Sequence, residues 1–262
     1  MRIEKQATLF ISHGSPMLAI EDSETSRFLS QLGQQLGKPK AIVVFSAHLD
    51  VADDVIITAG KRPELIYDFY GFPKPLYSLK YPAPGHPELA EDIARIFANA
   101  GIESRLDAEL GWDHGVWMPL YLMYPDADIP IVQVSINSRI GVESNYRLGK
   151  LLAPLRGEGV MLIGSGGISH NLREVFSPNP NKEKRQKVDA FTAWVDDKLQ
   201  AKDTGSLIEY LKHAPHALFN HPTQEHFMPL FSAMGSSDLS EVVRLHDAVQ
   251  YDVLAMDAYQ FS

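Results

Sequence analysis

Strand-length runs of apolar residues alternate with amphipathic segments along most of this chain, and this alternation constrains its fold more than any other feature. The apolar runs cover residues 7–11, 41–45, 129–136 and 159–163. The segments with helical periodicity cover residues 23–36, 87–98, 144–155 and 182–199. Buried strands that alternate with helices are typical of a mostly parallel sheet with helices on both faces. We therefore predict an α/β fold, organised as a single domain over residues 1–262.

Composition restricts the chemistry and the partners of this chain. It contains no cysteine, which excludes disulfides, thiolate metal sites and a cysteine nucleophile. The net charge of -9, without a long basic run, argues against nucleic-acid binding. No apolar run approaches the roughly 18 residues of a membrane span, and the polar amino terminus does not resemble a signal peptide. We expect a cytoplasmic protein with a small-molecule partner, and the sequence leaves monomer and homo-oligomer both open.

Three histidines follow the expected carboxyl ends of separate strands by only a few residues. They are His13 in ISHGSP, His48 in FSAHLD and His170 in IGSGGISHN. Because parallel strands end at a common edge, where ligands bind in open α/β sheets, these imidazoles are expected to meet in one crevice. Neutral imidazole is a ligand for Fe(II), Zn(II) and similar ions. The positions together therefore indicate a metal site, although for each histidine taken alone a structural role at a strand end is favoured.

Two further histidines have suggestive surroundings. His226 lies in NHPTQEHFMPL, which looks like the start of a helix and would place Glu225 and His226 in its first turn. Adjacent helical residues point about 100° apart, so only one of the two is expected to face an ion. His114 is flanked by tryptophans and glycines in an expected loop, where a buried structural role competes with a functional one. The other histidines, His86, His213, His216, His221 and His246, show no convergent pattern.

Residues 61–87 form an aromatic and proline-rich segment with six tyrosine or phenylalanine side chains. Long loops of this kind often fold over a binding site, and a flexible linker would not carry so many large rings. The alternative is a loop packed against the core. The sequence leaves these two readings equally favoured.

A series of short motifs, in the same order and over nearly the whole chain, resembles the class III extradiol ring-cleaving dioxygenases, and within them the DOPA-4,5-dioxygenase-like branch. The motifs are SHGSP (12–16), SAH (46–48), DFYGFP (68–73), YPAPG (81–85), DHGVW (113–117), MYPDADIP (123–130), GSGGISHNL (164–172) and EHFMPL (225–230). The resemblance implies a non-haem iron enzyme that opens a catechol ring beside its two hydroxyls with O2. The whole chain would then be one catalytic domain.

The resemblance also implies roles for individual residues. His13, His48 and His226 look like the metal ligands, and His170 looks like the catalytic acid or base. His114 would orient the substrate or assist as a second catalytic group, tuned by Asp113 unless Asp113 caps a turn. Whether His170 or Glu225 also contacts the ion stays open.

Three alternatives remain at the level of sequence. Zn(II) could occupy the site in place of Fe(II), but zinc has no accessible redox change and would not support ring cleavage. A zinc-dependent hydrolase would use the same residues to activate water. A non-enzymatic metal-binding or adaptor relative would have no need for the full set of His13, His48, His170 and His226, which the chain retains.

Overall fold

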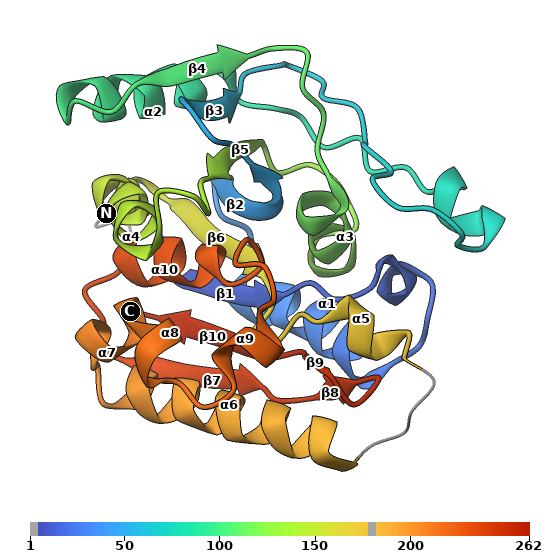
Figure 1. Ribbon diagram of the computed structural model, residues 1–262. Coiled ribbons are helices and arrows are strands. Elements are labelled where there is room, and N and C mark those ends of the chain that lie inside the picture. The colour runs from blue at the N-terminus through green and yellow to red at the C-terminus, as the bar shows by residue number, and fades with distance from the viewer. Residues whose placement is uncertain (1–4, 178–181) are drawn as a thin grey trace.

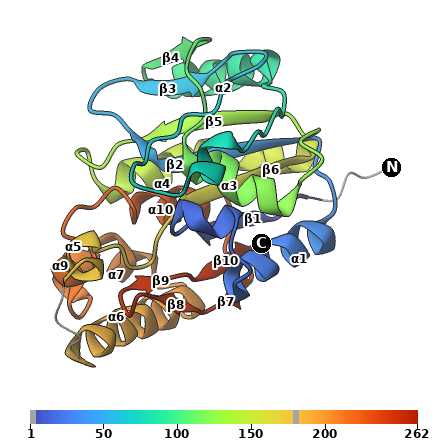
Figure 2. The same cartoon turned by 90° about the vertical axis from the view of Figure 1, so that its right-hand side faces the viewer.

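A mixed sheet forms the centre of the computed structural model, which describes residues 5–177 and 182–262. Within these residues eight strands form one sheet in the order β4-β3-β5-β2-β6-β1-β10-β7, which runs from one end of the molecule to the other in Figures 1 and 2. These strands are β1 (Thr8–Ser12), β2 (Ala41–Asp50), β3 (Val55–Thr58), β4 (Ser104–Asp107), β5 (Ile131–Ile136), β6 (Val160–Gly166), β7 (Val242–His246) and β10 (Ala258–Phe261). A separate hairpin pairs β8 (Val249–Gln250) with β9 (Leu254–Ala255).

The four central strands β5, β2, β6 and β1 are parallel. Nearly all of their side chains are buried, as expected for a parallel sheet covered on both faces. β10 joins β1 and β7 in antiparallel fashion, and β3 lies antiparallel to β5. The predicted α/β architecture with a mostly parallel sheet is confirmed.

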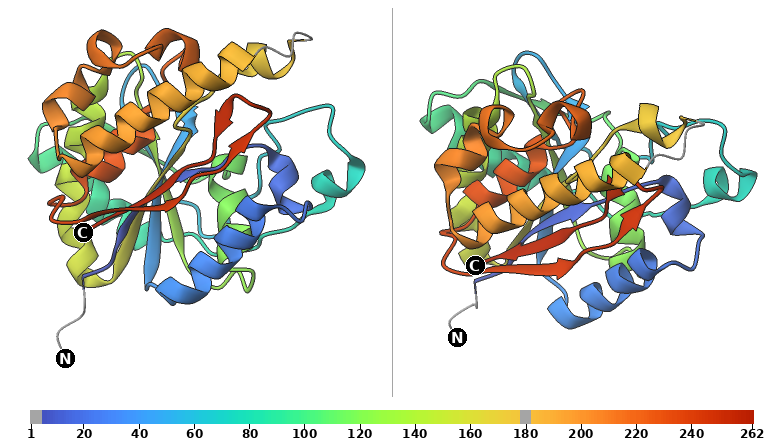
Figure 3. Two further views of the ribbon diagram at one scale, coloured as in Figure 1. Left: turned by 90° about the horizontal axis from the view of Figure 1, so that it is seen from below. Right: turned by 60° about the horizontal axis from the view of Figure 1, so that its bottom comes forward.

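Helices cover both faces of this sheet. The longer ones are α1 (Glu24–Leu36), α2 (Pro87–Asn99), α3 (His114–Met123), α4 (Val142–Leu152), α6 (Lys182–Gln200) and α10 (Met228–Gly235). The short ones are η1 (Pro16–Ala19), η2 (Lys74–Ser78), η3 (Ala153–Glu158), α5 (Leu172–Val175), α7 (Thr204–Ile208), α8 (Tyr210–His213) and α9 (Ala217–Asn220). α1 packs on α3 and α10 packs on α4, and Figure 3 shows α1 and α6 on opposite sides of the sheet. None of the described helices is both long and apolar enough to cross a membrane.

Local sequence signals explain where several helices begin. At α1 the Ser23 hydroxyl accepts from the Ser26 amide and the Ser26 hydroxyl accepts from the Ser23 amide, a capping box. At α2 the ring of His86 accepts from the Leu89 amide, and Pro87 occupies the first turn. His86 therefore has the structural role that its sequence context indicated.

Several predicted boundaries were wrong. β2 continues to Asp50, so His48 lies inside this strand and not after it, beyond a register shift that begins at Ser46. The helix expected over residues 144–155 ends at Leu152 and continues as η3. α3 was not predicted because it is apolar on all sides and contains Pro119, which removes the amphipathic period.

Two glycines of β6 let the chain before and within α10 approach the sheet closely. A Cβ atom on Gly164 would lie 2.1 Å from the carbonyl oxygen of Pro229, and one on Gly166 would lie 2.2 Å from that of His226. Only glycine allows such contacts. This close packing places the turn that carries His226 directly over the end of β6.

Candidate metal centre and active-site cavity

Three histidines from separate elements converge at the carboxyl-terminal edge of the parallel strands. His13 directly follows β1, His48 lies near the end of β2, and His226 lies in the turn before α10. The ring centroids of His13 and His48 are 4.9 Å apart, and that of His226 lies 5.5 and 5.0 Å from them. One ring nitrogen of each lies within 4.8 Å of those of the other two. The three residues predicted as metal ligands therefore form one cluster.

In His13 and His226, a hydrogen bond at Nδ1 determines which ring nitrogen carries the proton. The Ser165 hydroxyl donates to the Gly115 carbonyl at 2.5 Å, so it accepts from His13 Nδ1 at 3.0 Å. Nδ1 of His226 donates to Glu225 Oε1 at 3.0 Å. Both rings are buried, and burial, reinforced by neighbouring histidines, lowers the pKa of each well below its ordinary value. Each ring is therefore neutral, with its lone pair on Nε2.

The carboxylate of Asp68 lies between His48 and His114 and contacts Nδ1 of each ring. One oxygen of Asp68 lies 3.3 Å from Nδ1 of His48. The other accepts from the backbone amide of His114 at 3.0 Å and from its Nδ1 at 2.9 Å. Burial alone would raise the pKa of Asp68, but the hydrogen bonds and charges of these two histidines outweigh it and hold the pKa below its ordinary value. Asp68 thus orients two rings at once.

The Nε2 atoms of His13, His48 and His226 lie close together, as the donor atoms of a metal site do. Nε2 of His13 and Nε2 of His48 lie 2.9 Å apart. When each ring carries its proton on Nδ1, toward Ser165 and Asp68 respectively, both of these Nε2 atoms present lone pairs. Two lone pairs at that distance repel each other unless a cation lies against both. Nε2 of His226 is buried and has no hydrogen-bond partner among the described residues, which is costly for a polar atom. The donor set therefore fits a divalent ion bound by three neutral imidazoles, each oriented by a second hydrogen bond.

His170 lies beside this cluster and not within it. Its ring stacks on His226 at 3.4 Å between centroids and 7° between planes, and its amide donates to the Asn220 carbonyl. Burial, followed by the charge of His114, lowers the pKa of His170 to about 4. Glu225, His170 and His226 also have potential ligand atoms within 4.8 Å of one another. The side chains of Glu225 and His226 meet each other, and both residues precede α10, so the expectation that they lie in its first turn was wrong.

His114 and Asp113 differ from the sequence-based interpretation. His114 is the first residue of α3 and not part of a loop, and its ring lies 4.1 Å from that of His48. The carboxylate of Asp113 accepts from Ser46 and from Gln133. Asp113 therefore does not bond the His114 ring, and Asp68 does so instead. Asp68 had appeared only as the first letter of the DFYGFP motif, and nothing in that motif indicated which histidines it would face.

A cavity of about 600 Å³ opens next to the histidines. Its walls include Phe69, Tyr70 and Phe72 from the aromatic segment, together with His114 and His170. The later part of the same segment, around the buried Leu76 and Tyr81, packs on the core. The segment thus combines both readings, because Phe69 and Phe72 line the cavity and also pack against the core.

His221 was expected to be an ordinary polar histidine, and this expectation was wrong. It is fully buried, donates from Nε2 to the Ile168 carbonyl at 2.8 Å, and stacks on Phe227 at 4.7 Å. It therefore links the loop that carries His170 to the turn that carries His226. In contrast His213 pairs with Glu209 at the surface, as a histidine without a special role does.

Comparison with known proteins connects this geometry to a family. Residues 7–261 match the family model described as the catalytic LigB subunit of aromatic ring-opening dioxygenase. The chain is 40% identical to a 4,5-DOPA dioxygenase extradiol of Beta vulgaris, over 97% of this chain and 96% of that protein. It is 41% identical to a protein of the same name from Escherichia coli K12, over 94% and 90% respectively. A crystal structure of an uncharacterized Escherichia coli K12 protein superposes with a TM-score of 0.81 at 35% identity, covering 98% of this chain and all of that one.

Proposed function

This chain belongs to the class III extradiol dioxygenases, the family of the catalytic LigB subunit, and from that premise we propose that His13, His48 and His226 hold one Fe(II) ion at which a catechol ring is opened. The chain is an enzyme that cleaves catechol rings at the extradiol position with O2. The observation that carries the ligand assignment is the convergence of three Nε2 lone pairs, one of them buried without a partner.

Iron, when bound, would supply coordination for both catechol oxygens and a redox path between ring and dioxygen, which zinc lacks. The protein contributes a fixed face of three imidazoles and an open side that faces the cavity. Asp68, Ser165 and Glu225 hold the rings in the tautomer that ligation requires. These contacts lower the cost of ordering the ligands when the ion binds.

His170 is proposed as the acid and base of the reaction, with His114 as the second group. The lowered pKa of His170 keeps its ring neutral near pH 7. The neutral ring can accept a proton from a catechol hydroxyl and return it during ring opening. The Nδ1 proton of His114 is held by Asp68, so its Nε2 is the nitrogen available to the substrate. The aromatic rings of Phe69 and Phe72 form an apolar wall suited to a planar ring.

The test is oxygen uptake after anaerobic loading with Fe(II), using unsubstituted catechol and L-DOPA, the substrate named for the relatives. We expect oxygen consumption together with a new absorbance from the ring-opened product. Protein loaded with Zn(II) should consume none. Equal oxygen uptake by the two metal forms, or none with any catechol, would contradict the proposal. A zinc-dependent hydrolase on the same residues is not favoured, since the relatives carry dioxygenase names.

The ligand assignment is tested separately by metal content. His13→Ala and His48→Ala should each lose the ion on desalting. His213→Ala should keep it, because His213 is exposed and pairs with Glu209. His170→Ala should retain the metal and lose turnover. Loss of metal from His170→Ala would make His170 a ligand instead.

A further inference from the structure

The turn between β8 and β9 has a strained backbone. The Val253 amide donates to the Gln250 carbonyl at 3.2 Å, and the two residues between them, Tyr251 and Asp252, have φ angles of 52° and 59°. Turns with two positive φ angles usually carry Asn or Asp followed by Gly, because a side chain disfavours the left-handed region. A residue as bulky as tyrosine is an outlier at such a position.

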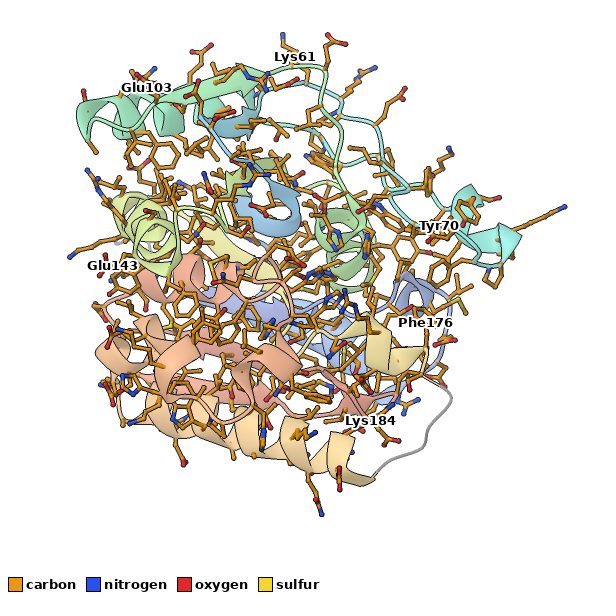
Figure 4. The ribbon with its side chains drawn as sticks, viewed as in Figure 1. Lys61, Tyr70, Glu103, Glu143, Phe176 and Lys184 are labelled. Carbon is orange, nitrogen blue, oxygen red and sulfur yellow. The ribbon has the colours of Figure 1, made fainter. Side chains whose placement is uncertain are left out.

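This strain coincides with the cavity beside the histidine cluster. Of the six non-glycine residues with positive φ in the described chain, only Tyr251 lines the cavity. Tyr251 is 56% exposed, so it lies at the opening and not at the buried floor. Tyr70 and Phe176 line the same cavity, and Figure 4 shows both on one side of the molecule. Because strained residues gather where a side chain is used, the position of Tyr251 indicates a function.

Contacts on both sides of the turn hold it in this conformation. Val253 is fully buried, and its carbonyl accepts from the Ser169 hydroxyl at 2.7 Å. Ser169 directly precedes His170, the proposed acid and base. β8 and β9 pair in register on either side of the turn. The turn is therefore joined to the loop that carries His170, which gives Tyr251 a set place relative to the reacting ring.

The cavity has room for a substituent on the catechol ring. Pockets of about 300–1,000 Å³ bury most of a drug-sized ligand, and this cavity measures about 600 Å³. With both catechol oxygens at the proposed metal ligands, the far side of the ring faces the opening. A tyrosine there offers a flat apolar ring and a hydroxyl that can hydrogen-bond the polar end of a substituent.

We propose that Tyr251 is a specificity-determining residue that binds the ring substituent of a substituted catechol at the mouth of the cavity. The inference rests on the proposed catechol cleavage and adds the residue that distinguishes substituted from unsubstituted catechols. The ring of Tyr251 packs against the substituent, and its hydroxyl bonds the polar end. A residue better suited to the turn should therefore preserve or stabilise the fold and weaken substrate binding.

The experiment replaces Tyr251 with asparagine, which adopts positive φ readily and so preserves the turn. Initial oxygen uptake by the Fe(II)-loaded enzyme gives kcat and KM for L-DOPA, the substrate named for the relatives, and for unsubstituted catechol. We expect Tyr251→Asn to lower kcat/KM for L-DOPA at least about 10-fold, mainly through KM, because a ring contact and a hydrogen bond are lost. The value for catechol should change by less than about 2-fold. Tyr251→Phe, which keeps the ring, should lower the L-DOPA value by only about 3-fold.

Stability provides a second readout. The midpoint of urea unfolding of the Tyr251→Asn chain should equal or exceed that of the wild type, because the strain in the turn is relieved. Asp252→Asn is the matched control, since it changes the other strained position of the turn, lies outside the cavity lining and retains Tyr251. It should leave kcat/KM for both substrates within about 2-fold of the wild-type values.

The outcomes separate this inference from the proposed function. Turnover of neither substrate by the wild-type enzyme would mean that the proposed function itself fails. Equal losses for L-DOPA and catechol in Tyr251→Asn, or an unchanged value for L-DOPA, would overturn the inference. A lower urea midpoint for Tyr251→Asn, or an equal loss of L-DOPA turnover in Asp252→Asn, would mean that the turn acts through the fold alone and would overturn it as well.

Discussion

Replacement of Gly166 by alanine should displace His226, one of the proposed metal ligands, without touching any of the proposed ligand side chains. A Cβ atom there would lie 2.2 Å from the carbonyl oxygen of His226, which also accepts from the Gly167 amide at 2.8 Å. An ordinary carbon–oxygen contact is about 3.3 Å, so the turn that carries His226 must move by about 1 Å. Metal-ligand distances tolerate only about 0.2 Å. The added methyl group therefore acts directly on the geometry of the site.

We expect Gly166→Ala to weaken metal binding at least about 10-fold and to lower the free energy of unfolding by about 1–3 kcal/mol, as overpacking does. Competition with a chromophoric chelator measures the first quantity, and urea unfolding of the metal-free protein measures the second. Gly167→Ala is the matched control. Its Cβ would lie 3.5 Å from the nearest atom, and neither glycine has a positive φ.

Two outcomes would refute this reasoning. Wild-type metal affinity in Gly166→Ala would mean that the turn can shift without cost to the site. Equal losses in Gly166→Ala and Gly167→Ala would mean that the effect reflects backbone flexibility and not the close approach to His226. Nothing in the local sequence distinguishes the two glycines, because their roles depend on which atoms face them in the fold.

Two further predictions concern groups that the sequence did not identify. Asp68→Asn should weaken metal binding by about 10–100-fold and lower kcat, because the carboxylate orients both His48 and His114. Asp128→Asn, which removes an exposed ion pair, should change neither metal affinity nor kcat. Wild-type metal affinity in Asp68→Asn would refute the positioning role of Asp68. Burial lowers the pKa of His221 to about 3, so below pH 6.5 the unfolded chain takes up a proton that the folded chain does not. Its contribution to stability is complete above pH 6.5 and is lost as the pH falls toward 3. Metal-free wild type should therefore lose about 1.4 kcal/mol per pH unit more than His221→Phe between pH 6 and 4 in urea unfolding, and parallel pH profiles would contradict this.

The sequence predicted the four central strands from their short apolar runs, and the amphipathic helices from the apolar stripe that one-sided burial leaves at helical spacing. It also placed His13, His48 and His170 near one sheet edge, since parallel strands end together. It did not predict α3 or the start of α10. Both are apolar on all faces and buried, and burial all round removes the period on which such a prediction depends.

The candidate metal centre was indicated by the sequence alone, as histidines at strand ends and as motifs in a fixed order. What only the tertiary structure decided is how those side chains are used. Asp68 and Ser165 contact the proposed ligands His48 and His13, which lie 20 and 152 positions away in the chain. Such contacts join residues remote in sequence, and no local pattern records them because the backbone path brings them together.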